Sequence, residues 1–299
     1  AQIVRGRTVN LMPQRSIYGY ASGPNFRPDD TKTPVFAALD RLRRTGVRRG
    51  FIPIASTEGW ISRHAQFRTY LAQVGYPPVE VVAFLRPVVD WTNSAFWQWG
   101  IWHAGTMDRW MSRGGMPYRF GAELEAWAQI PNVRLRFARA RPDAVARFAS
   151  WQGVDLPTVH LRNASSAPAL IGVLMRNRAL RPNGHDASTE FVVSRWCAPV
   201  PGRKLWAMQA RHVEALRAVA VETLVSLERV GSAQDMADLH NDPRWLQERP
   251  YHAEIVKGVS PLDDRNQMAK LYNSLCDGVK RATAAVGRPV AGALPICPA

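Results

Sequence analysis

Long hydrophobic runs are absent from this sequence, and cysteine is scarce. No apolar run approaches the roughly 18 residues that a membrane-spanning helix needs, so we expect no membrane span. The three cysteines, Cys197, Cys276 and Cys297, are widely spaced and odd in number. They therefore provide neither a disulfide framework nor a metal-ligand spacing. A reducing, cytoplasmic compartment and a metal-free site are the expectations that follow.

Acidic residues are few relative to basic ones. The chain has 39 lysines and arginines against 24 aspartates and glutamates, which gives a formal net charge of +15. Nearly all of this charge is arginine, because the only lysines are Lys32, Lys204, Lys257, Lys270 and Lys280. Such a balance favours an anionic partner, for example nucleotide phosphates or an acidic glycan. Nucleic acid is a less favoured partner, because the arginines are scattered and no recognisable binding module is present.

The hydrophobic pattern predicts an α/β protein. With 299 residues and 46% hydrophobic residues, the chain is long enough to bury a substantial core. Short apolar or alternating runs predict strands at 51–55, 79–85 and 133–137. Amphipathic stretches predict helices between and after them, at 34–45, 61–74, 120–129, 167–179, 205–227 and 265–285. The first two strands and the helix between them predict a βαβ unit with parallel strands. The C-terminal half is expected to be rich in helix, with a loop at 181–204 that resembles a mobile lid.

The stretch from Val79 to Met111 carries the strongest indication of a binding site. A buried strand ends with Arg86 and Pro87, and a helix capped by Asp90 or Thr92 follows from Trp91. Ser94 then falls in the first turn of that helix. Ligands of parallel sheets bind at the carboxyl ends of strands, where Arg86, Ser94 and the free N–H groups of the helix predict a phosphate cradle. The alternative is that the arginine and the serine have only structural roles.

The same stretch resembles a known family. The residues Leu85-Arg86-Pro87, Asp90-Trp91 and Ser94-Ala95-Phe96 resemble the 3′-phosphate-binding segment of sulfotransferases that use 3′-phosphoadenosine 5′-phosphosulfate (PAPS), and the bacterial carbohydrate sulfotransferase-like proteins in particular. The resemblance implies that Arg86 and Ser94 hold the donor's 3′-phosphate. It also implies a P-loop-like sulfotransferase fold, with a parallel central sheet and helices on both faces, as a single domain over residues 1–299.

A candidate catalytic base lies at the end of the strand at 51–55. Ser56-Thr57-Glu58 resembles the Ser-Ser-Glu step of related bacterial proteins, which implies that Glu58 removes the proton from the acceptor hydroxyl. A carboxylate suits this task when partial burial raises its pKa. Alternatively, Ser56 or Thr57 caps the next helix and Glu58 complements the helix dipole. His64, farther along that helix, is a weaker alternative base.

Two further features have both a functional and a structural interpretation. Residues 162–166 resemble an R-x-N-x-S step, which implies that Arg162 and Ser165 are additional nucleotide ligands; the alternative is a loop with a capping serine. Trp99 and Trp102 share a helix face. They either line an acceptor cleft, where aromatic rings stack on sugars, or pack in the core.

The resemblance fails at the N-terminus, because nothing in residues 1–33 matches the Gly/Thr/Ser-rich, lysine-containing loop that clamps the 5′-phosphosulfate. Three explanations are open: the loop precedes Ala1, it is disordered and not represented, or the protein has lost it together with its activity. The start at Ala1 favours an incomplete N-terminal part. The expected function is transfer of a sulfuryl group from PAPS to a carbohydrate hydroxyl, with 3′-phosphoadenosine 5′-phosphate (PAP) as product. The alternative is a non-catalytic relative that binds a nucleotide, an acidic glycan or a protein.

Overall fold

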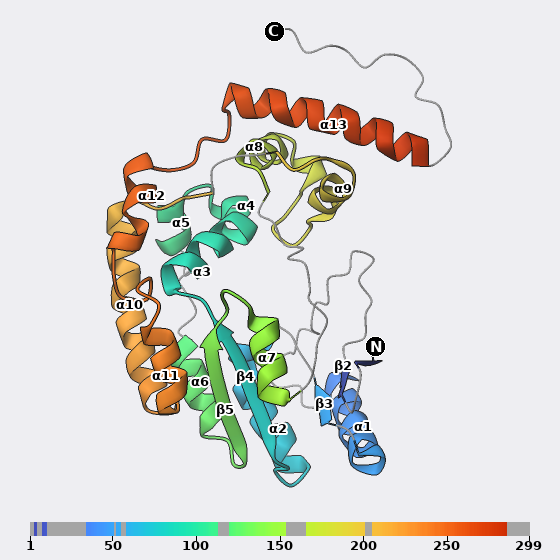
Figure 1. Ribbon diagram of the computed structural model, residues 1–299, viewed down its shortest axis with the longest axis vertical. Helices are drawn as coiled ribbons and strands as arrows, with labels where there is room; N and C mark the ends of the chain where they lie inside the picture. The colour runs from blue at the N-terminus through green and yellow to red at the C-terminus, as the bar shows by residue number, and fades with distance from the viewer. Residues whose placement is uncertain are drawn as a thin grey trace. The chain divides into compact units, whose positions relative to one another are not determined.

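The chain divides into two compact units. The computed structural model describes residues 3–4, 8–10, 34–50, 52–54, 58–112, 120–153, 166–200 and 205–285. The first unit comprises residues 1–87, 118–160 and 218–245, and the second comprises 88–117, 161–217 and 246–299. Helices make up most of the described residues (Figure 1). The expectation of a single domain stays a prediction.

The first unit contains all the described strands. These are β1 (Ile3–Val4), β2 (Thr8–Asn10), β3 (Ile52–Ile54), β4 (Val79–Leu85) and β5 (Val133–Arg139). Its helices are α1 (Pro34–Arg49), η1 (Glu58–Arg63), α2 (His64–Gln73), α6 (Phe120–Ala128), α7 (Ala144–Gln152) and α11 (Ala233–His240). The second unit is helical in its described residues: α3 (Val88–Ala95), the π-helical η2 (Phe96–Gly100), α4 (Ile101–Ala104), α5 (Met107–Ser112), α8 (Pro168–Arg176), η3 (Arg178–Leu180), α9 (Ser188–Trp196), η4 (Arg249–Tyr251), α12 (His252–Lys257) and α13 (Arg265–Ala285). Helix α10 (Ala210–Glu228) contributes residues to both units.

Strands β4 and β5 form a parallel pair, in register from Val79 with Val133 to Leu85 with Arg139. The predicted parallel orientation is therefore present, but the predicted βαβ pairing differs. In the described residues β3 pairs with β2, and β4 pairs with β5. The hydrophobic pattern identifies a strand but does not identify its neighbour, which is chosen by tertiary packing.

Helices cover both faces of the β4–β5 pair, as the α/β class requires. On one face, Trp151 of α7 stacks on Phe84 with ring centroids 5.4 Å apart. The guanidinium of Arg136 lies 4.2 Å from the centroid of the Trp151 ring. On the other face, the fully buried Phe137 packs against Gly231, just after α10, so closely that a Cβ on this glycine would lie 2.3 Å from the Phe137 ring. Figure 1 shows α7 and α11 flanking the pair.

Aromatic rings join the helices of the first unit. Phe36 of α1 stacks on Tyr70 of α2 with centroids 4.8 Å apart. Phe67, one turn earlier on α2, packs against Trp127 of α6, with ring centroids 5.0 Å apart. The indole N–H of Trp127 donates to the carbonyl of Ile61 at 2.9 Å, so this large side chain is buried with its polar atom satisfied.

The second unit contains a buried, non-helical segment at 205–208. The side-chain amide of Asn93 donates to the carbonyl of Leu205 at 2.8 Å, and its Oδ1 accepts from the N–H of Ala207 at 3.0 Å. Trp206, fully buried, exchanges hydrogen bonds with Ser260. Residues 205–209 were predicted to begin a helix, but α10 begins only at Ala210. Asn93 and Ser260 satisfy backbone groups of this non-helical segment instead.

Other boundaries also differ from the sequence predictions. Helix α1 continues through Gly46, and Gly50, at φ +67°, follows its last residue. The predicted lid at 181–204 contains α9. By contrast, the helix predicted at 265–285 is confirmed. Trp102 is 5% exposed, so its interpretation as a core residue is confirmed.

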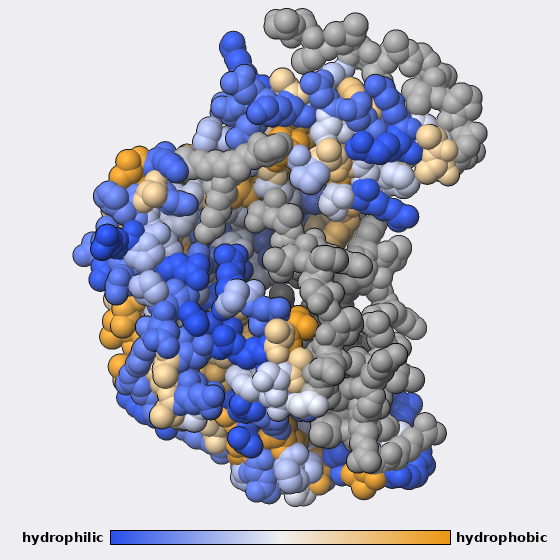
Figure 2. All heavy atoms as spheres, viewed as in Figure 1, coloured by the Kyte–Doolittle hydropathy of each residue, from blue (hydrophilic) through white to orange (hydrophobic). Residues whose placement is uncertain are grey.

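On the face shown in Figure 2, hydrophilic residues cover much of the described part, with hydrophobic residues scattered between them. This agrees with the high charge of the chain. Within the described residues, no helix combines the length and the apolar composition needed to cross a membrane.

Candidate anion-binding site

Arg86 lies where the carboxyl ends of two parallel strands meet. It directly follows Leu85, the last residue of β4, which is 4% exposed. Leu85 is in register with Arg139, the last residue of β5, and its carbonyl accepts from the N–H of Ala140 at 2.7 Å. The two strands therefore end together, and a half-buried arginine follows at their carboxyl edge. This is the location that the sequence predicted for it.

A carboxylate from α11 also reaches this edge. Asp238 accepts from the backbone N–H of Arg139 at 2.7 Å and from its guanidinium Nε at 3.3 Å. Arg147 of α7 forms an ion pair with the same carboxylate. Partial burial raises the pKa of Asp238, but the hydrogen bonds and charges of Arg147 and Arg139 outweigh that effect and lower the pKa below its usual value. Asp238 therefore stays ionised and joins β5, α7 and α11.

A second aspartate near the end of α11 is paired in a similar way. Asp242, 5% exposed, accepts from the backbone N–H and from two guanidinium nitrogens of Arg244, at 2.9 to 3.1 Å. The first unit thus places arginines and ionised carboxylates together around the end of β5. Asp238 and Asp242 were not predicted to be charge partners, because their arginines are distant in the chain or were assigned no role.

Ser94 differs from its predicted position. Helix α3 begins at Val88, directly after Pro87, so Ser94 is the seventh residue of the helix and not part of its first turn. The first turn carries Asp90, which is 5% exposed and accepts from the hydroxyl of Tyr251 at 3.3 Å. The predicted cap is thus a buried acid within the helix. Ser94 belongs to the second unit, whereas Arg86 belongs to the first.

The two candidate bases lie at the first residues of η1 and of α2. Glu58 is the first residue of η1, and its side chain lies outside what the structure describes. His64 is the first residue of α2, and its Nε2 lies 3.3 Å from Oε2 of Glu123 on α6. This contact joins the start of α2 to α6. The candidate ligands Arg162 and Ser165 lie outside the described residues.

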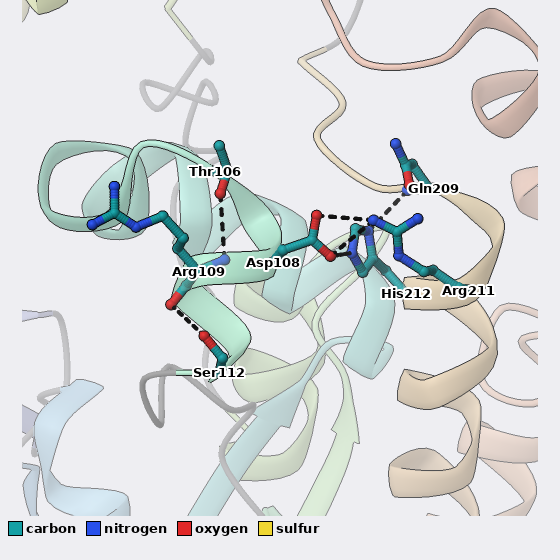
Figure 3. A network of polar contacts seen from close by, with 7 residues as sticks. All are labelled: Thr106, Asp108, Arg109, Ser112, Gln209, Arg211 and His212. Atoms are coloured by element: carbon teal, nitrogen blue, oxygen red, sulfur yellow. Dashed lines mark hydrogen bonds and ion pairs between the residues drawn. The ribbon is translucent and has the colours of Figure 1, made fainter.

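The second unit contains an aspartate–histidine pair that the sequence analysis did not identify (Figure 3). Nε2 of His212 lies 2.7 Å from Oδ1 of Asp108, and its Nδ1 accepts from the N–H of Gln209 at 3.0 Å. Arg211 donates to both oxygens of the same aspartate. Hydrogen bonds from His212 and then Arg211 lower the pKa of Asp108. Since both ring nitrogens are engaged, His212 ties α5 to α10 and is not a candidate base.

A buried arginine in the same unit also has a structural role, because its guanidinium is engaged by other groups of the protein. Arg181 is 3% exposed, forms an ion pair with Glu190 and donates to the carbonyls of Gln98 and Gly184. Its guanidinium also lies 4.2 Å from the centroid of the Trp102 ring. Burial lowers the pKa of Arg181 to about 10. These contacts fix the position of Arg181, the first residue of the segment 181–204 that was predicted to be a mobile lid.

Comparison with known proteins yields no relative: no protein-family model, curated protein or solved structure matches the chain. Among the residues that the structure describes, no group of three or more histidine, cysteine, aspartate or glutamate side chains is placed to hold a metal ion. The candidate site is the edge at which β4 and β5 end. The sequence predicted Arg86 to lie there, and the parallel pairing of the two strands places it there.

Proposed function

We propose that the protein is a sulfotransferase that moves a sulfuryl group from PAPS to a hydroxyl of a carbohydrate acceptor. The observation that carries this proposal is the position of Arg86, at the carboxyl end of a strand in a parallel pair. Parallel sheets bind ligands at this edge. A guanidinium there offers the planar, permanently charged fork that a phosphate accepts in a bidentate manner.

In the proposed reaction, the acceptor oxygen attacks the sulfur of PAPS while the bond from sulfur to the 5′-phosphate oxygen breaks. PAP leaves with the electron pair, and the hydroxyl proton passes to a base. Glu58 is the first candidate for that base, by the resemblance given above. His64, the first residue of α2, is the alternative base.

The protein's contribution to such a displacement is mainly positioning and neutralisation of charge. Arg86 would hold the 3′-phosphate and so fix the donor relative to the base. Ser94 keeps the role that the resemblance implies, as a second ligand of that phosphate. Arg162 and Ser165 remain proposed additional ligands.

Calorimetric titration of PAP into the intact protein tests the donor site. We expect micromolar binding that Arg86→Ala weakens at least about tenfold, since a charge-assisted bidentate pair is worth about 1.5–3 kcal/mol. Arg134→Ala is the matched control. It removes the same charge from an exposed position near the start of β5, and should bind PAP as the unmodified protein does.

Two other outcomes would change the interpretation. If the folded protein binds no PAP, the sulfotransferase proposal is wrong, and Arg86 belongs to a structural turn. If PAP binds but no hydroxyl acceptor receives labelled sulfate from PAPS, the alternative of a non-catalytic nucleotide-binding protein is favoured.

A further inference from the structure

Arg139 and Arg147 both pair with the carboxylate of Asp238. This pairing affects which anions can bind at the edge where β4 and β5 end. The side chains of these arginines are 26% and 25% exposed, and that of Asp238 is 18% exposed. All three are thus partly accessible to a small anion. Two guanidinium groups that converge on one carboxylate also have the geometry that binds sulfate or a phosphate monoester.

We propose that Asp238 is a specificity-determining residue, which occupies the Arg139–Arg147 pair as a built-in carboxylate and so excludes a second oxyanion from this edge. The placement of this role beside the donor site rests on the proposed function. Without Asp238, the same edge would offer an additional position for sulfate or for a phosphate monoester. With it, the donor's phosphate is directed to Arg86.

The backbone contact of Asp238 supports a role specific to this position. The carboxylate accepts from the N–H of Arg139, the last residue of β5. The next residue, Ala140, donates to Leu85, which precedes Arg86. The carboxylate is therefore held in place by the strand end itself and not only by two side chains. An external anion has to displace a group that is covalently part of the protein and already partly buried.

The replacement Asp238→Asn separates charge from shape, since an asparagine oxygen can still accept from the N–H of Arg139. The probe is sodium sulfate, titrated by calorimetry at constant ionic strength with chloride as the balancing anion. We expect Asp238→Asn to bind sulfate about tenfold more tightly than the unmodified protein, because two charge-assisted donors become available. Asp238→Glu, which keeps the charge, should behave as the unmodified protein does.

The matched control is Asp40→Asn on α1. Asp40 also pairs with two arginines, Arg43 at 2.9 Å and Arg44 at 2.7 Å, so its replacement changes the net charge equally and releases the same number of guanidinium groups. Its arginines are three and four residues away on one helix and are not fixed by a strand end. If Asp40→Asn gains as much sulfate affinity as Asp238→Asn, the effect is bulk charge and the proposal is wrong.

Arg147→Ala in the otherwise unmodified protein provides a second test that does not depend on the folding of the Asp238 variants. Because Asp238 already occupies Arg147, this change should leave sulfate affinity unaltered. A loss of sulfate binding would show that Arg147 binds anions in the native protein and would overturn the proposal. These experiments use no PAPS or PAP, so they can succeed even where Arg86 fails to bind the nucleotide.

Discussion

His212 shows how a single residue with catalytic chemistry can have a structural role. Its ring is 6% exposed, with Nε2 facing Asp108 and Nδ1 accepting from the backbone of Gln209. The ring joins α5 to the start of α10 and to the non-helical segment before it. Arg211 binds the same carboxylate but lies on the surface, with 62% of its side chain exposed. Burial therefore predicts that the two partners of Asp108 differ in their contribution to stability.

Replacement of His212 by alanine is expected to lower the free energy of unfolding by about 2–3 kcal/mol, because it removes a buried side chain, opens a cavity and leaves the N–H of Gln209 without its acceptor. Urea denaturation, followed by circular dichroism, measures this loss. Arg211→Ala removes an exposed partner of the same aspartate, so it should cost less than about 1 kcal/mol. Equal losses in the two variants would contradict the assignment of His212 as the structural tie.

At the scale of elements, close backbone contact explains a helical glycine that the sequence analysis did not single out. Gly172 lies within α8, where alanine would normally be favoured by about 1 kcal/mol. A Cβ at this position, however, would lie 2.0 Å from the carbonyl oxygen of Leu262, in the segment between α12 and α13. Both residues belong to the second unit. The absence of a side chain is what allows this approach.

We therefore expect Gly172→Ala to destabilise the protein by about 2 kcal/mol or more, against the usual preference for alanine in helices. Thermal unfolding measures the change. Gly59 in η1 is the matched control, since no atom lies within 4 Å of the position that its Cβ would take. Gly59→Ala should leave the melting temperature nearly unchanged. A stable Gly172→Ala variant would mean that α8 does not approach Leu262 as closely as described.

At the scale of the whole molecule, paired aspartates in both units link stability to pH. The pKa values of Asp108, Asp186, Asp238 and Asp242 are all lowered by hydrogen bonds or ion pairs with neighbouring residues. A group whose pKa is lower in the folded state stabilises the fold above its unfolded pKa, near pH 4. That contribution is lost as the pH falls through the folded-state value, because the unfolded chain binds more protons.

The melting temperature should accordingly fall as the pH drops below about 4, the usual pKa of a carboxyl group, because these carboxylates then take up protons more readily in the unfolded chain. In the double variant Asp238→Asn, Asp242→Asn, two of the groups no longer titrate, so the decrease with falling pH should be shallower. Differential scanning calorimetry across this range measures both slopes. Identical slopes in the two proteins would show that these carboxylates do not control the acid response.

The elements around the candidate site were predicted correctly where the local hydrophobic pattern is enough to identify an element and its end. The run 79–85 is apolar and β-branched, so its strand and the position of Arg86 at its end follow from the sequence alone. The predicted place of Ser94 in a first turn was wrong, because α3 begins directly after Pro87. Asp238 was not identified as a site residue, since its contacts with Arg139 and Arg147 span 99 and 91 residues of chain.

The sequence by itself determined the charge of the protein, the main helices and strands, and the residue that ends β4. These features depend on composition and on periodicity within one element, and both can be read locally. Only the tertiary structure decided that β5 is the described partner of β4, that residues 205–208 are not helical, and which carboxylate pairs with which arginine. Those outcomes depend on burial and on contacts between segments far apart in the chain, where packing and desolvation outweigh local preference.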